Sequence, residues 1–186
     1  MHGRQLGRSG LLRTLAAGII LSTAHPCSYA VDSGSFEFST GNFTQMIRLG
    51  AQWDWQQKWF QSENSFLGGY WDLTVADWRG THYRNTPGNI QNIFDIGITP
   101  VFRLQRNDGS GPYFEAAIGA HQLSDKYDNN DRKLSTRFEF GDSLGIGYRF
   151  SKAWDAGLKI QHFSNGGIAE PNSGVNYIVA RISKRF

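Results

Sequence analysis

Apolar and polar residues alternate along most of this chain, and that pattern restricts the fold more than any other feature of the sequence. A period of two residues is typical of a β-strand whose two faces meet different surroundings. Eight alternating segments follow one another, separated by turn-rich breaks: 31–39, 44–55, 66–78, 93–105, 113–121, 136–150, 154–165 and 176–186. Beyond residue 30, no apolar run approaches the roughly 20 residues that a membrane-spanning helix needs. We therefore expect an all-β fold.

The length of these segments favours a membrane barrel over a soluble β-sandwich. Strands in globular proteins usually have about five or six residues, whereas a strand of about ten crosses a bilayer at a tilt. In segment 44–55, Ile47 and Leu49 lie on one face, while Arg48 and Asp54 lie on the other. Similar charged faces recur, which indicates a polar interior that side chains fill, as a barrel of eight strands allows. The sequence predicts an eight-stranded antiparallel transmembrane β-barrel.

The first 30 residues are typical of a cleavable signal peptide, so the barrel domain is expected to span 31–186. Arg4, Arg8 and Arg13 precede a short apolar stretch, and Ser28 and Ala30 are small residues at the two positions that a signal peptidase reads. The whole chain has 19 basic and 16 acidic residues, so removing these three arginines leaves 16 of each. A mature chain with no net charge lacks the excess positive charge that is typical of proteins that bind nucleic acids.

Removal of the signal peptide would also exclude cysteine chemistry. The chain has one cysteine, Cys27, and it lies in the expected signal peptide. The mature chain would therefore have neither disulfides nor thiolate metal sites.

The end of the chain and its turns suggest the outer membrane of a Gram-negative bacterium. The last segment ends on an aromatic residue, Phe186. With both termini periplasmic, the breaks near 40–42, 80–91, 122–134 and 166–173 lie outside the cell, and those near 56–65, 107–111 and 150–152 lie inside. Candidates for interfacial aromatic girdles are Trp53, Trp55, Trp59, Phe60, Tyr70, Trp71 and Trp78.

Three histidines remain after the leader, and two of them have simple structural explanations. His82 falls in a polar outer loop, and His121 shares a strand face with Glu115, so it is expected to point into the lumen. The three histidines are far apart in the sequence and do not have the spacing of metal ligands. We expect neither a metal, calcium included, nor a cofactor.

His162 is different, because its strand parity places it on the lipid-facing side together with Ser164. The same face carries Leu158 and Ile160. Polar groups are costly there unless they have partners. Both lie near the outer end of their strand, at the depth of the lipopolysaccharide leaflet. A histidine can act as the general base for a serine nucleophile, and Asn176 is the outward polar residue at matching depth on the next strand.

Two readings of this cluster remain open at this point. In one, His162 and Ser164 are catalytic. In the other, they merely occupy the membrane interface at a strand end, in a non-catalytic barrel such as an adhesin or a structural protein.

The residues around this cluster resemble the signature of the PagL family of lipid A 3-O-deacylases. The motif is His162-Phe163-Ser164-Asn165-Gly166-Gly167-Ile168, followed by Pro171-Asn172-Ser173-Gly174. Upstream similarities cover the rest of the mature chain in order: Arg48-Leu49-Gly50, Trp53-Asp54-Trp55, Gly69-Tyr70-Trp71-Asp72, Pro100-Val101-Phe102 and the run 114–119.

The resemblance implies an eight-stranded outer-membrane barrel that hydrolyses the ester at the 3-position of lipid A, with lipopolysaccharide as its substrate. It implies that Ser164 is the nucleophile and His162 the base. It also implies that Asn165 and Gly167 form the oxyanion hole. Strand parity turns the side chain of Asn165 inward, so its backbone N–H is the expected donor. Lipid A would reach the site laterally from the leaflet.

One position departs from the family pattern. The family's acid is a glutamate that aligns with Asn176, and asparagine carries no charge, although it can accept a hydrogen bond from His162 as in Cys–His–Asn enzymes. Glu170, in the adjoining loop, is the alternative acid. An inactive family member, a barrel acyltransferase and a homodimer formed through a lipid-facing strand also stay open.

Overall fold

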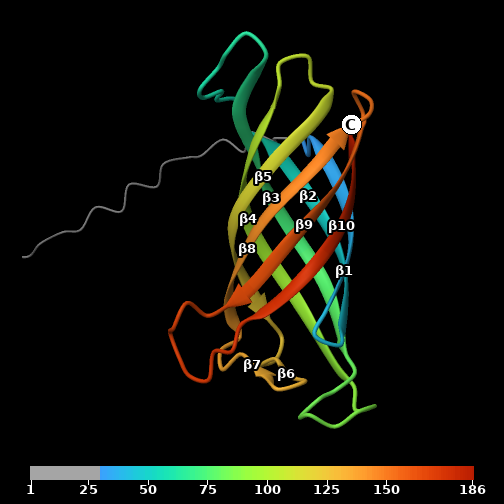
Figure 1. Ribbon diagram of the computed structural model, residues 1–186, viewed down its shortest axis with the longest axis vertical. Helices are drawn as coiled ribbons and strands as arrows, with labels where there is room; N and C mark the ends of the chain where they lie inside the picture. The colour runs from blue at the N-terminus through green and yellow to red at the C-terminus, as the bar shows by residue number, and fades with distance from the viewer. Residues whose placement is uncertain (1–29) are drawn as a thin grey trace, which may run out of the picture.

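The computed structural model describes residues 30–186, so the expected signal peptide and Cys27 lie outside the described residues, apart from Ala30. Within this range the chain forms a closed barrel of eight strands, drawn upright in Figure 1. The barrel strands are β1 (Ser33–Gly41), β2 (Thr44–Asp54), β3 (Ser65–Gly80), β4 (Gln91–Arg106), β5 (Gly111–Leu123), β8 (Phe138–Arg149), β9 (Trp154–Ser164) and β10 (Val175–Arg185).

Every barrel strand pairs antiparallel with its neighbours, and β1 pairs with β10 to close the sheet. The eight-stranded fold expected from the alternation is thus confirmed, with strand ends displaced by one or a few residues. A feature that the sequence pattern did not reveal is the short hairpin of β6 (Asp128–Asn129) and β7 (Arg132–Lys133), which lies in the long loop after β5. Among residues 30–186, no helix is long and apolar enough to span a membrane.

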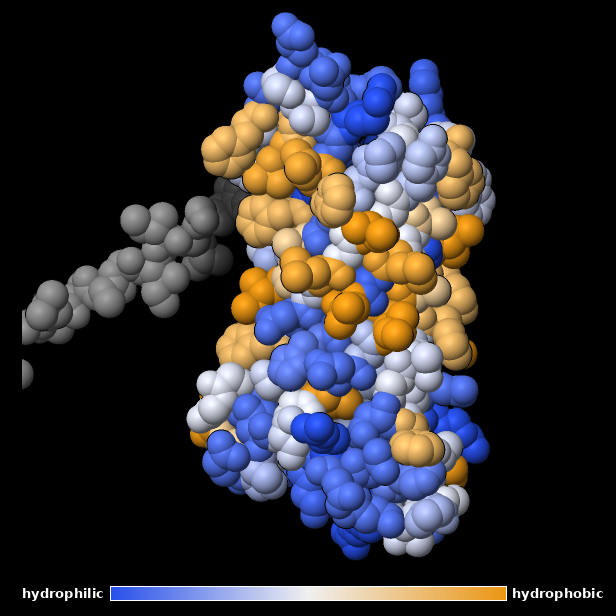
Figure 2. Space-filling model, in the orientation of Figure 1, coloured by the Kyte–Doolittle hydropathy of each residue, from blue (hydrophilic) through white to orange (hydrophobic). Residues whose placement is uncertain are grey.

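An apolar band surrounds the outside of the barrel. Figure 2 shows it as orange side chains between two hydrophilic ends. Leu144 and Ile160 are 70% and 66% exposed, an exposure that would be costly in water but suits hydrocarbon. The long loops predicted to be extracellular gather at the lower end in Figure 1, with the β6–β7 hairpin among them.

The middle of the lumen is a network of buried charges. Glu37 is fully buried and lies 2.7 Å from Lys159 and 3.0 Å from Arg48. A second group joins Arg103 to Glu115 at 2.7 Å, and Arg181 to Asp155 at 3.2 Å. Glu37, Glu115 and Asp155 each have a cationic partner, so the charges of these three buried carboxylates are compensated.

The extracellular end of the lumen is apolar, which the sequence did not suggest. Phe163 packs against Trp78 and Tyr177, with ring centroids 4.7 Å and 6.0 Å away, and all three are buried. The prediction that Trp78 and Tyr70 belong to interfacial girdles was wrong. Both have inward parity on β3, and Tyr70 instead donates a hydrogen bond to Glu115 in the lumen.

Aromatic residues do gather at the other end of the barrel. Trp55 contacts Trp59, Trp71 and Phe102, with centroid distances of 5.7, 6.2 and 4.9 Å. Trp59 and Trp71 are partly exposed, in agreement with the girdle expected there.

Candidate active site on the outer face of the barrel

Three neighbouring strands bring the polar residues of the outer face into one row. On β9, His162 is the register partner of Asn176 on β10 and of Asp142 on β8. Ser164, the last residue of β9, lies one step toward the extracellular end and pairs with Phe140. The alternation that builds the barrel therefore places a histidine, a serine, an asparagine and an aspartate on its lipid-facing surface.

His162 and Asn176 are directly hydrogen-bonded. The Nδ1 atom of His162 lies 2.6 Å from the amide oxygen of Asn176. An amide oxygen can only accept, so Nδ1 must carry the hydrogen and donate it. In a neutral imidazole this fixes the tautomer, and the lone pair of Nε2 is left to receive a proton.

Ser164 lies on the same strand face as His162, two residues further along β9. Within residues 30–186, no hydrogen bond joins the two side chains. Hydrogen bonds between a base and its nucleophile are often long before substrate binds and tighten in the reactive complex. The arrangement is therefore compatible with a serine–histidine pair.

Gly174 supports the imidazole from the loop that precedes β10. A Cβ atom added at Gly174 would lie 2.5 Å from Cε1 and 3.0 Å from Nε2 of His162. The backbone there has φ of +60°, which also favours glycine. The ring of His162 thus rests against the backbone of Gly174, where a larger residue would displace it.

The loop between β9 and β10 is organised by Asn165. This side chain is fully buried, donates to the carbonyl of Ala169 at 2.8 Å and accepts the N–H of Gly167 at 2.9 Å. The N–H of Asn165 itself donates to the side-chain oxygen of Asn172 at 3.1 Å. The backbone donors of both predicted oxyanion residues are thus held inside the loop, and Asn172 is a further amide that the sequence reasoning did not assign.

A second loop braces this one. Arg132 donates to the carbonyl of Ser173 at 2.9 Å, and the N–H of Ser173 donates to the carbonyl of Lys133 at 3.0 Å. A bridge between Leu134 and Asn172 continues the contact. The β6–β7 hairpin region therefore helps to fix the loop that follows Ser164.

Glu170, the alternative acid, lies in the same loop and is exposed. Its carboxylate accepts the N–H of Asn172 at 2.9 Å. Among the described residues, no hydrogen bond or ion pair links Glu170 to His162. The side chain that meets His162 in this structure is Asn176.

Asp142 is a residue of this row that the sequence reasoning missed. It shares the outward parity of Leu144 on β8, and its Oδ1 atom is buried without a hydrogen-bond partner among residues 30–186. The sequence pattern that could have revealed Asp142 is a single carboxylate on the otherwise apolar outward face of β8. Ionisable groups inside a membrane are costly and usually functional.

The neighbouring histidines take no part in this row. His121 is buried in the lumen, where Nδ1 lies 3.1 Å from Asp95, so its expected inward position is confirmed. His82 packs on Phe43 in the extracellular loops, with ring centroids 4.0 Å apart. Across residues 30–186, no group of three or more histidine, cysteine or acidic residues could hold a metal ion.

Comparison with known proteins identifies the family. A family model described as lipid A 3-O-deacylase (PagL) matches residues 45–185. The lipid A deacylase PagL of Pseudomonas aeruginosa is 31% identical over 166 residues, which cover 88% of this chain and 92% of that protein. The chain belongs to the PagL family of lipid A 3-O-deacylases.

Further comparisons agree with this family. The lipid A deacylase PagL of Bordetella bronchiseptica is 28% identical over 178 residues, covering 93% of this chain and 92% of that protein. A crystal structure of the outer membrane enzyme PagL matches with a TM-score of 0.73 at 27% identity, covering 83% of this chain and 99% of that one. The closed barrel is thus the PagL fold, and this chain is an outer-membrane barrel.

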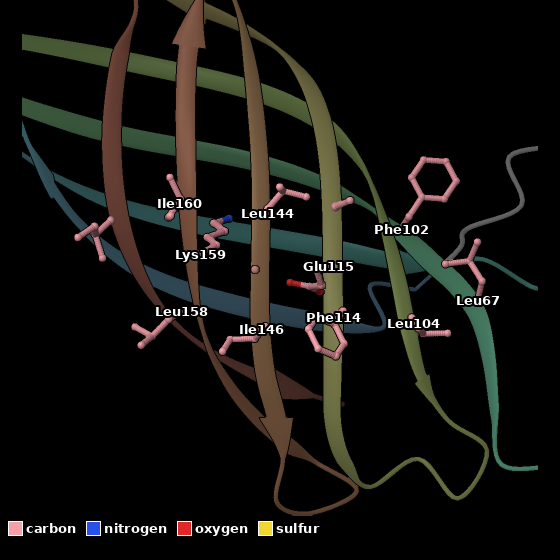
Figure 3. Close-up of a pocket in the computed structure, with 13 residues that line it drawn as sticks. Leu67, Phe102, Leu104, Phe114, Glu115, Leu144, Ile146, Leu158, Lys159 and Ile160 are labelled. Atoms are coloured by element: carbon pink, nitrogen blue, oxygen red, sulfur yellow. The ribbon is translucent and has the colours of Figure 1, made fainter.

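An apolar groove leads away from the row on the lipid-facing side of this PagL-family barrel. Beside Asp142 and His162 it encloses about 480 Å³. A second hollow of about 620 Å³ continues it along the strands and shares Phe102, Ala116 and Leu144 with the first; Figure 3 shows the aliphatic and aromatic side chains that line it. Ala116 is the register partner of both Phe102 and Leu144. Its side chain is only a methyl group, so a hollow remains between these two larger residues.

Proposed function

We propose that this PagL-family chain removes the acyl chain esterified at the 3-position of lipid A by a serine-esterase mechanism. The observation that carries this proposal is the 2.6 Å contact between His162 Nδ1 and Asn176 Oδ1, on the lipid-facing surface and one step from Ser164. A buried or lumen-facing site could not meet a lipid, whereas this row can receive lipid A laterally from the outer leaflet.

In the first step, His162 Nε2 takes the proton of the Ser164 hydroxyl while the oxygen attacks the ester carbonyl. Asn176 keeps Nδ1 protonated and holds the ring, so that Nε2 is the basic atom. The carbonyl oxygen becomes an oxyanion in the tetrahedral intermediate.

We assign the oxyanion hole to the loop that follows Ser164. Asn165 and Gly167 are the residues that the family resemblance suggests. Their N–H groups donate to Asn172 and Asn165 in this structure, so they would have to exchange these acceptors for the oxyanion. The N–H of Asn165 also fixes Asn172 by its side-chain oxygen, which leaves the amide nitrogen of Asn172 as an additional donor. Loss of one such donor typically costs about 10²–10³ in rate.

The intermediate then collapses. The carbon–oxygen bond to the sugar breaks, and the sugar oxygen takes the proton from His162. The acyl group stays on Ser164 until water, deprotonated by His162, attacks the acyl-enzyme. The products are a 3-hydroxy fatty acid and lipid A with a free hydroxyl at the 3-position.

The groove beside His162 is the place for the acyl chain. It starts at the row and is lined by apolar side chains from β4, β5, β8 and β9. All groups that the mechanism uses come from one chain, so the reaction does not require the homodimer that the sequence left open.

Mass spectrometry of lipid A after incubation with the refolded barrel tests the proposal. Loss of one hydroxyacyl chain with the native barrel, and no loss with folded Ser164→Ala, is the expected result. Unchanged lipid A with both proteins would support the non-catalytic barrel or an inactive family member. A gain of mass on a second lipid would indicate acyl transfer instead.

A further inference from the structure

We infer that Asp142 supplies the negative charge that Asn176 cannot, as an electrostatic partner of His162 in the reaction. The inference rests on the serine-esterase mechanism proposed above. It assigns to β8 a positioning residue that acts through His162, on the side opposite Asn176.

The register of the barrel places Asp142 beside His162. The two residues are direct cross-strand partners on β8 and β9, and both border the groove of about 480 Å³. Side chains of directly opposite residues on one sheet face have Cβ atoms about 4.5–5.5 Å apart. No hydrogen bond or ion pair joins their side chains among residues 30–186, so Nδ1 stays with Asn176, and the charge of Asp142 would act on the imidazole through space.

The carboxylate of Asp142 also lacks a partner that would balance its charge. Its Oδ1 atom is buried without a hydrogen-bond partner among the described residues, on a face where its neighbours Phe140 and Leu144 are apolar. An unpaired carboxylate in such surroundings is costly to maintain. A positive charge that forms next to it during the reaction would be stabilised strongly, because the medium screens it weakly.

The other groups that face His162 do not provide this charge. Asn176 on β10 is neutral, and Gly174 contributes backbone. Ser164 on its own strand is the nucleophile. In the same loop as Gly174, the carboxylate of Glu170 is bonded to the N–H of Asn172. The carboxylate aligned with His162 on a neighbouring strand is therefore Asp142.

This placement explains how a PagL-family chain can work with asparagine at the third position. Asn176 fixes the tautomer and the orientation of the ring. Asp142 stabilises the imidazolium that forms when His162 accepts the serine proton. The two tasks that one carboxylate performs in Ser–His–Asp enzymes are divided between two strands.

The test compares Asp142→Asn with Asp142→Glu on two substrates. One is lipid A, and the other is a short p-nitrophenyl ester whose acyl chain has no hydroxyl. We expect Asp142→Asn to lower kcat by about 10- to 100-fold on both substrates, with KM changed less than about threefold, because general-base catalysis is worth about 10²–10⁴ in total. Asp142→Glu should recover most of the loss.

Two controls separate this effect from a structural one. Asp77→Asn removes a carboxylate with outward parity on β3, away from β9, and should leave both rates unchanged. In an Asn176→Glu background, where a carboxylate again meets His162, Asp142→Asn should cost less than about threefold, because the charge is then supplied from β10.

Three results would overturn the inference. One is an Asp142→Asn barrel that is folded and fully active on both substrates. A second is a loss confined to lipid A, which would show that Asp142 binds a polar group of the substrate. The third is an undiminished loss in the Asn176→Glu background. Inactivity of the native barrel toward lipid A would be a different outcome, since it would remove the proposed function itself.

Discussion

His162 and Asn176 face each other across the β9–β10 pair, and their side chains meet at 2.6 Å between Nδ1 and Oδ1. A neutral amide thus occupies the position where a carboxylate would both orient and stabilise the imidazole. Replacement Asn176→Glu should keep or raise kcat, because the added charge favours the imidazolium. Asn176→Leu, which removes the acceptor, should lower kcat by about 10²-fold or more.

Steady-state assays of fatty acid release from lipid A would measure both effects. Abolished activity in a folded Asn176→Glu barrel would contradict the alignment of this position with the acid of the family.

Glu170 provides a direct comparison with Asn176. Its carboxylate accepts the N–H of Asn172 at 2.9 Å. Glu170→Gln keeps an oxygen acceptor for that bond, so we expect kcat to change by less than about threefold, as the loss of charge is exposed to solvent. A loss as large as that of Asn176→Leu in the same assay would transfer the orienting role to Glu170.

Gly174 should be sensitive even to one added methyl group. Gly174→Ala brings a Cβ within 2.5 Å of the imidazole of His162, so the ring must move and kcat should fall by about 10²-fold, as expected for a displacement of about 1 Å at a catalytic group. The matched control is Gly88→Ala, because Gly88 also has positive φ but open space around the added atom. Equal activity of the two folded variants would argue against the contact.

The groove should set the length of the acyl chain that is released. Ala116→Phe fills the hollow between Phe102 and Leu144, so we expect slower release of long chains and a shift of preference toward shorter ones. Ala180→Phe, on the exposed face of β10, adds the same side chain outside the groove. Product profiles by mass spectrometry should change in the first variant and stay constant in the second.

The stability of the barrel should depend on Glu37. Glu37→Gln leaves Arg48 and Lys159 without their buried carboxylate, and breaking a buried ion pair typically lowers the free energy of unfolding by about 3–5 kcal/mol. Urea titration of the refolded barrel in micelles measures the change.

Asp108→Asn is the control for this change. Hydrogen bonds from Arg106 lower the pKa of Asp108 to about 2, but this pair lies in an exposed turn. Water screens such a pair, so the urea midpoint should stay close to that of the native barrel. A similar shift in both variants would indicate a general effect of charge.

The fold could be predicted because strand parity is visible in the sequence. Leu158, Ile160 and His162 follow one face of β9 without interruption, and the neighbouring strands repeat the pattern. The same parity placed Asn176 correctly. Trp78 was misassigned because its aromatic character was given more weight than its position on the inward face of β3.

The rest of the site depends on register and on loop bonding, which the sequence does not display. The parity of Asp142 can be read from the sequence, but its position opposite His162 requires the alignment of β8 with β9. Asn165 and Asn172 are seven residues apart in a turn-rich loop, where no periodic pattern indicates which groups meet. The β6–β7 hairpin is too short to produce a detectable alternation.

The aromatic cluster of Trp78, Phe163 and Tyr177 fills the lumen directly behind the strand that carries the nucleophile. Water therefore does not reach Ser164 from inside the barrel, and the molecule that hydrolyses the acyl-enzyme has to arrive along the headgroup layer. The second half of the reaction then depends on how wet that layer is. The enzyme should turn over more slowly in tightly packed lipid than in loosely packed, hydrated micelles, even where the ester itself is equally accessible.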